Sequence, residues 1–170
     1  AGSSGSTLAA QQPENNIVRV ALQALAGILG GVQSIHTAAF DEALALPSEH
    51  SALLALRTQQ VLAHESGAGD VIDPLGGSYY VESLTDQIEA EVKAQIARIE
   101  DEGGMLKAIE DGRAQAEIAK AAYAYQQQID DGARTFVGVN KFQDAEDPRI
   151  ELHRPRPEIV AAQIEALTAL

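Results

Sequence analysis

A short β-rich run between two helical stretches limits most strongly what this chain can fold into. The run covers Val32–Thr37 and directly follows the glycine pair Gly30–Gly31. The periodicity of the whole chain predicts about five or six helices and only one or two strands, with Thr135–Val139 as the second strand candidate. A strand without neighbours leaves both of its edges unpaired. We therefore expect the chain to be a piece of something larger or an obligate assembler.

Start and stop signals place a helix on each side of this run. Pro13–Asn16 supplies an acid and an asparagine cap for a helix that ends at Gly30–Gly31, and the apolar positions of that helix cover more than one face. Ser48 follows Pro47 and predicts the cap of a second helix, which runs to about Glu65. Further helices are expected from Ser83 or Thr85 to Gly103, over Met105–Glu110, over Arg113–Asp130 and from Pro157 to Leu170. The first helix and the β-rich run after it indicate an αβ unit. A single unit of this kind, followed by helices, does not close a sheet.

Charge and composition narrow the classes of function. The 12 basic and 25 acidic residues give a net charge of −13, which repels phosphate backbones and anionic lipid heads and argues against a nucleic-acid or membrane-surface role. The chain has no Cys, which excludes disulfides, thiolate metal sites and Cys nucleophiles. Its longest apolar run lies within Ile17–Leu29 and is interrupted by Arg19 and Gln23, so it falls short of the ~20 residues that cross a bilayer. We expect a cytoplasmic chain with neither a nucleic-acid nor a membrane partner.

Polar residues on the β-rich run and in the turn after it form the candidate site. Gln33 and His36 lie on the run, and Asp41–Glu42 lies in the turn that follows. A strand that delivers polar groups and a carboxylate into a loop before a helix is how α/β proteins build ligand sites. From the residues alone, His36 also fits a structural strand end, and Glu42 also fits a solvated turn acid or a helix cap. The remaining histidines show no metal-ligand spacing, so no metal site is expected: His50, His64 and His153.

Five blocks of sequence carry a resemblance to a known family. The long blocks are SGSTLAAQQPENNIVRVALQALAGILGG (Ser4–Gly31), QSIHTAAFDEALALPSEHSALLALRTQQVLAHESG (Gln33–Gly67) and VIDPLGGSYYVESLT (Val71–Thr85). The shorter blocks are GGMLKAIEDG (Gly103–Gly112) and VGVNKFQ (Val137–Gln143). Together they resemble the large subunit of the adenosylcobalamin-dependent acyl-CoA mutases, the methylmalonyl-CoA mutase family.

The resemblance implies a fold. In that family a (β/α)8 barrel binds the acyl-CoA, and a separate flavodoxin-like domain binds the cobalamin. The chain would then be mainly α with one or two short strands: the end of the barrel followed by a helical extension. Residues 1–67 would be the last part of the barrel, 68–143 the helical extension, and 144–170 a charged linker with a C-terminal helix. Asn16–Leu29, Val32–Thr37 and Ser48–Glu65 would be the seventh helix, eighth strand and eighth helix of the barrel. The Asp-x-His-x-x-Gly signature of the cobalamin domain does not occur in this sequence.

The resemblance also assigns cofactor contacts. Glu42 matches the acid of the DEALALP motif, which in the family accepts hydrogen bonds from the ribose hydroxyls of the adenosyl group. Gln33 and His36, on the eighth strand, would be further cofactor-binding residues. Two positions depart from the family pattern, because Gly2 stands where the family has a ribose-binding Gln and Ala38 where it often has Asn. No catalytic residue is expected here, since the general-acid His and the Tyr that steers the radical belong to earlier strands.

The function expected from the resemblance is that of a segment of an acyl-CoA mutase. Such an enzyme catalyses a radical carbon-skeleton isomerisation of the methylmalonyl-CoA/succinyl-CoA type with adenosylcobalamin. Its partners would be the acyl-CoA substrate and a cobalamin-binding domain or subunit, and this chain alone would be inactive. The alternative is a catalytically silent helical module, derived from a mutase, that self-associates and so buries its exposed barrel-facing surfaces.

Overall fold

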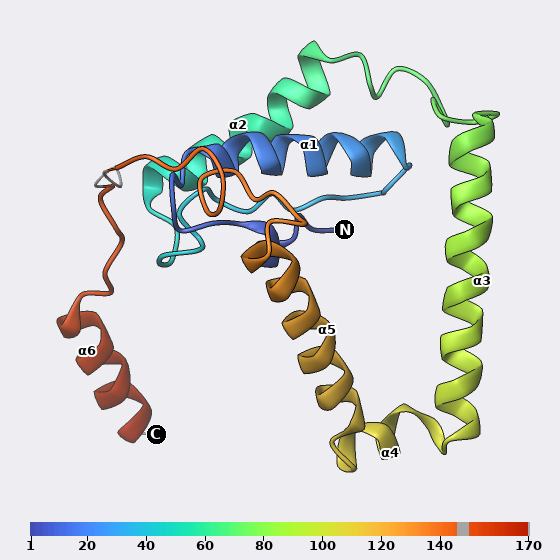
Figure 1. Ribbon diagram of the computed structural model, residues 1–170. Helices are drawn as coiled ribbons and strands as arrows, with labels where there is room; N and C mark the ends of the chain where they lie inside the picture. The colour runs from blue at the N-terminus through green and yellow to red at the C-terminus, as the bar shows by residue number, and fades with distance from the viewer. Residues whose placement is uncertain (146–149, 170) are drawn as a thin grey trace. The chain divides into compact units, whose positions relative to one another are not determined.

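The computed structural model describes residues 1–145 and 150–169, and most of them are helical (Figure 1). The elements are the 3-10 helix η1 (Gly5–Thr7) and the α-helices α1 (Asn15–Leu29), α2 (Glu49–Glu65), α3 (Tyr79–Asp101), α4 (Gly104–Glu110), α5 (Arg113–Asp130) and α6 (Pro157–Thr168). The prediction of a mainly α chain is therefore confirmed. Within the described ranges, no helix is both long and apolar enough to cross a membrane.

The predicted strands are wrong for the part of the chain that the structure describes. Val32–Thr37 is reduced to one parallel bridge between His36 and Gly2, and Thr135–Val139 to one parallel bridge between Val137 and Lys141. Ser3 N donates to His36 O at 2.8 Å, and His36 N donates to Ala1 O at 3.0 Å. A strand is defined by a ladder of consecutive bonds, and among the described residues each of the two segments has only an isolated bridge.

Helix starts follow local capping, with two corrections. Ser48 caps α2 by accepting from Ser51 N, as predicted. The first helix begins at Asn15 without a side-chain cap, so the expected asparagine cap does not form. The long helix α3 begins at Tyr79, where Ser78 is the cap, rather than at Ser83 or Thr85. A serine in extended backbone ahead of the first turn suffices to start that helix earlier.

The chain divides into two compact units. Unit 1 comprises Ala1–Pro74 and Asp144–Leu170, and unit 2 comprises Leu75–Gln143. In unit 1, α1 packs against α2 (Figure 1), and the buried residues Leu8, Val20 and Ala38 form a small apolar cluster. In unit 2, α4 contacts both α3 and α5. The buried apolar side chains of unit 2 are Ala108 and Ile129, so the described part of this unit has a thin core.

A buried asparagine joins the segments of unit 1. The side chain of Asn16, at 0% exposure, accepts from Ala9 N at 3.0 Å and donates to Ala9 O and Phe40 O, each at 2.8 Å. An amide that is committed to Ala9 and Phe40 in this way cannot also cap the helix. Its bonds hold the loop after His36 against α1, and that loop carries the candidate site.

Candidate functional site

The loop between the His36 bridge and α2 is a closed turn built around Asp41. Asp41 is 1% exposed, and its Oδ2 accepts a hydrogen bond from Ser48 N at 3.0 Å. Its carbonyl oxygen accepts from Leu44 N at 2.9 Å and from Ala45 N at 3.1 Å. Side chain and main chain of one residue therefore close the turn that leads into α2.

Glu42 follows Asp41 and is half-buried. Its N–H donates to Ala39 O at 3.2 Å, and its Oε1 accepts from Ala39 N at 3.0 Å. The carboxylate therefore folds back over its own turn and is not a free, fully solvated acid. Glu42 is not the cap of α2 either, since Ser48 has that place. No described residue donates to Oε2, so one carboxylate oxygen is available as an acceptor.

Gln33 and His36 take no part in the hydrogen bonds of the Glu42 carboxylate. Both are exposed, and Gln33 belongs to no helix or bridge. His36 is held through its backbone N–H and carbonyl, which bond to Ala1 and Ser3. Within the described residues, no hydrogen bond joins the side chains of Gln33, His36 and Glu42. The structure therefore places these three predicted residues along one segment without gathering them into a single cluster.

A partly buried polar network behind the loop was not predicted. Thr37 Oγ1 donates to Ala55 O at 2.8 Å, and Gln59 Nε2 donates to Thr37 Oγ1 at 2.9 Å and to Ile35 O at 3.2 Å. These bonds attach the end of the β-rich run to α2. The available signal was a glutamine on the side of α2 that packs inward, since a polar group that is taken out of water needs a partner.

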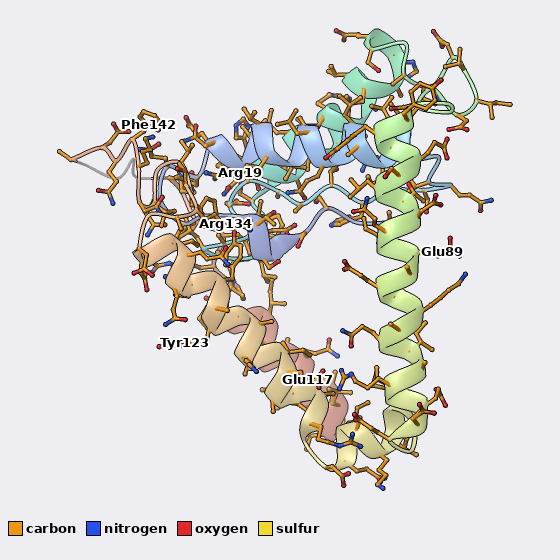
Figure 2. All side chains as sticks on the ribbon, turned by 45° about the vertical axis from the view of Figure 1, so that its right-hand side comes forward. Arg19, Glu89, Glu117, Tyr123, Arg134 and Phe142 are labelled. Carbon is orange, nitrogen blue, oxygen red and sulfur yellow. The ribbon has the colours of Figure 1, made fainter. Side chains whose placement is uncertain are left out.

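Arg19 is a partly buried cation in unit 1. Its Nη1 donates to Asn16 Oδ1 at 2.7 Å, and it lies on α1 (Figure 2). Burial lowers the pKa of Arg19 from its ordinary value, because desolvation disfavours the charged guanidinium. The guanidinium stays protonated at neutral pH, so it places a positive charge next to the amide that holds the loop.

The loop offers a ligand one hydrogen-bond acceptor, the Oε2 atom of Glu42. A half-buried carboxylate with one uncommitted oxygen accepts hydroxyl donors well. Gly2, across the bridge from His36, is open: a Cβ added there would meet only His36 Cβ, at 4.0 Å. Unit 1 also has a groove of about 740 Å³, lined in part by Phe40, Ser48 and His50. Glu42 does not line that groove, so a ligand bound by Glu42 needs walls from elsewhere.

Comparisons with known proteins point to one family. The family model described as methylmalonyl-CoA mutase matches residues 1–170. The chain is 48% identical over 148 residues to the 2-hydroxyisobutanoyl-CoA mutase large subunit of Aquincola tertiaricarbonis, covering 86% of this chain and 26% of that protein. It is 50% identical over 145 residues to the methylmalonyl-CoA mutase of Escherichia coli, covering 85% and 20%. It is 46% identical over 160 residues to a probable methylmalonyl-CoA mutase large subunit of Mycobacterium tuberculosis, covering 94% and 21%. The chain thus spans about a fifth to a quarter of the length of these relatives.

Proposed function

Because the chain belongs to the methylmalonyl-CoA mutase family, we propose that it is the closing part of an acyl-CoA mutase barrel and that it lines the adenosyl group of adenosylcobalamin. The relatives are named as mutases, which are isomerases. The proposed reaction is a radical carbon-skeleton isomerisation of an acyl-CoA thioester, of the methylmalonyl-CoA/succinyl-CoA type. The acyl-CoA and a cobalamin-binding domain or subunit are the proposed partners.

The observation that carries the proposal is the parallel bridge between Gly2 and His36. Two parallel backbone segments joined through a helix are the repeating unit of a (β/α)8 barrel. Here α1 makes that connection, and α2 follows the second segment as the next barrel helix would. In this assignment residues 1–67 end the barrel, 68–143 form a helical extension, and 144–170 are a linker with a C-terminal helix. Leu75–Gln143 forms a compact unit of its own, which supports a separate helical extension that begins at Leu75.

Glu42 is the proposed cofactor contact with the best support. The C-terminal ends of barrel strands carry the ligand site, and in the proposed assignment Glu42 lies in the loop after the eighth strand position. Its Oε2 is the proposed acceptor for the ribose hydroxyls, while Oε1 stays on Ala39 N. Gln33 and His36, exposed on the preceding segment, are proposed to face the same cofactor. Adenosylcobalamin supplies the radical chemistry when bound, and the residues of this chain bind and orient its adenosyl group.

A second candidate function is self-association without catalysis. Ile88, Val92 and Ile96 lie at helical spacing on α3 and are 53%, 50% and 55% exposed. An exposed apolar stripe of this kind usually marks an interaction surface. In this proposal a helical module derived from a mutase buries the stripe against further copies of the chain.

The proposed function is tested in a full-length enzyme. The segment of Escherichia coli methylmalonyl-CoA mutase that matches this chain is replaced by the chain, and isomerisation of methylmalonyl-CoA is measured with adenosylcobalamin. We expect an active chimera in which Glu42→Gln raises the KM for adenosylcobalamin about tenfold or more, as for the loss of a hydrogen bond to a charged group.

Glu65→Gln is the matched control, because Glu65 is an exposed acid at the far end of α2. It should leave the KM for adenosylcobalamin at the parental value. A folded but inactive chimera would contradict the barrel assignment, and a parental KM in the Glu42→Gln variant would contradict the ribose contact. The 170-residue chain alone is expected to show no isomerisation, so activity of the chain alone would refute the proposal that it needs further walls.

A further inference from the structure

Asp41 is an acid that the proposed chemistry does not use, yet it is almost completely buried. It is 1% exposed, and aspartate is rarely buried to this degree unless it is paired. One oxygen, Oδ2, accepts from Ser48 N at 3.0 Å, while Oδ1 has no hydrogen-bond partner among the described residues. Burial of a carboxylate disfavours folding, so a residue kept there needs a compensating role.

The surroundings of Asp41 suit a carboxylate that acts as an anchor. Ser48 is the N-cap of α2, so the Asp41 carboxylate lies at the positive end of a 17-residue helix. The bond joins Asp41, within the loop between the His36 bridge and α2, to the N-cap of α2. The anchor therefore fixes the part of the loop that contains Glu42 relative to α2.

The anchor acts directly on the residue that follows. Glu42 is the next residue along the chain, and its side chain has one further tie, from Oε1 to Ala39 N. The carbonyl of Asp41 also accepts from Leu44 N and Ala45 N, so the backbone on the other side of Glu42 is held as well. With these bonds in place, the free oxygen of Glu42 has a restricted range of directions. Without the Asp41 anchor, that restriction has to be supplied when the ligand binds, at a cost in affinity.

We propose that Asp41 is a positioning residue for Glu42: it holds the loop so that the Glu42 carboxylate is preorganised for its ligand. Asp41 itself touches no ligand in this proposal, since its side chain is buried. The inference rests on the proposed function, because the ligand of Glu42 is taken to be the ribose of adenosylcobalamin.

The test uses the active full-length chimera and four variants: Asp41→Ala, Asp41→Asn, Glu42→Ala and the double variant Asp41→Ala/Glu42→Ala. We expect Asp41→Ala to raise the KM for adenosylcobalamin about tenfold and to change the KM for methylmalonyl-CoA by less than about twofold. Asp41→Asn keeps an oxygen for Ser48 N but loses the charge that strengthens the bond, so a rise of about threefold is expected. In the Glu42→Ala background, Asp41→Ala should add less than about twofold, because the group it positions is gone.

The matched control removes a charge from the same helix end without touching the anchor. Glu49 is an exposed acid in the first turn of α2, and Glu49→Ala should leave the KM for adenosylcobalamin unchanged. If Asp41→Ala does not fold, Asp41→Asn carries the test, since its amide fits the same space.

The outcomes separate the inference from the proposed function. A raised KM in Glu42→Ala with parental values in both Asp41 variants would overturn the positioning role and leave the ribose contact intact. An Asp41→Ala effect of full size in the Glu42→Ala background would also overturn it, because Asp41 would then act on something else. A parental KM in Glu42→Ala would refute the ribose contact itself, and the positioning inference with it.

Discussion

At the scale of single residues, Asn16 has the largest predicted effect on unit 1. Its amide holds Ala9 N, Ala9 O and Phe40 O in a fully buried site. Asn16→Ala leaves these backbone groups without partners, and each such loss costs about 1–3 kcal/mol. We expect the variant to lower the free energy of unfolding by at least about 2 kcal/mol, measured on the full chain by urea denaturation with circular dichroism.

Asn15 is the matched control for this prediction. It is the neighbouring asparagine, it is only half-buried, and its side chain donates to Gln12 Oε1 at 2.8 Å. Asn15→Ala should cost less than about 1 kcal/mol, as is usual for a partly solvated hydrogen bond. Equal losses in the two variants would show that Asn16 does not hold the segments together.

Residue-scale features divide into those that a sequence pattern reveals and those that it does not. Glu42 was predicted as a cofactor contact from a motif, and Gln33 and His36 from their place on the expected eighth strand; all three stay predictions. Asp41 and Asn16 were not recognised as anchors, because their importance lies in burial and in bonds to backbone groups 7 and 24 residues away. Nothing in the spacing of an Asp-Glu pair shows which of the two carboxylates faces inward.

At the scale of elements, the serine caps make a graded prediction. Ser48 Oγ accepts from Ser51 N at 3.2 Å, whereas Ser78 Oγ accepts from Val81 N at 3.5 Å, near the limit for a hydrogen bond. Ser48→Ala removes the cap of α2 but keeps the backbone N–H that donates to Asp41 Oδ2. We therefore expect the free energy of unfolding to fall by about 1 kcal/mol. Ser78→Ala should cost less. Urea denaturation of both variants checks the order, and a larger loss for Ser78→Ala would contradict it.

Charged residues connect α3 with α5 in unit 2. Arg98 makes two bonds to Glu117, from Nη1 to Oε1 and from Nη2 to Oε2, each at 2.8 Å, and Glu117 lies on α5 (Figure 2). The hydrogen bond from Arg98, together with its charge, lowers the pKa of Glu117, and the same pair raises the pKa of Arg98. Both side chains are exposed, so the pair contributes modestly and is screened by salt.

The pH dependence of this pair follows from the direction of the Glu117 shift. A carboxyl whose pKa is lowered by folding stabilises the folded state above its unfolded pKa, and that contribution is lost as the pH falls through the lower, folded value. Arg98→Gln should therefore reduce the Tm slightly at neutral pH and have no effect at acid pH or in about 1 M salt. Lys93→Gln, which removes an exposed pair with Glu89 inside α3, is the control. A difference that persists in high salt would exclude an electrostatic origin.

At the scale of the whole molecule, the exposed apolar stripe on α3 predicts self-association of the isolated chain. Ile88 and Val92 are half exposed, and burying them against another copy removes apolar surface from water. Sedimentation velocity should show a mass that rises with concentration, and Ile88→Lys/Val92→Lys should suppress the rise. Gln87→Lys, on the same helix but outside the stripe, adds one charge as a control. A chain that stays monomeric at all concentrations would contradict the prediction.

Family membership, high helix content and the start of α2 at Ser48 could all be read from local sequence. Each depends on residue types at short spacing, such as a serine before a helical turn or the DEALALP motif. Only the tertiary structure decided that Val32–Thr37 forms a single bridge and that Asp41 rather than Glu42 is buried. The physical reason is that strands and buried carboxylates depend on partners distant in the chain, and a local pattern carries no information about which backbone groups will reach them.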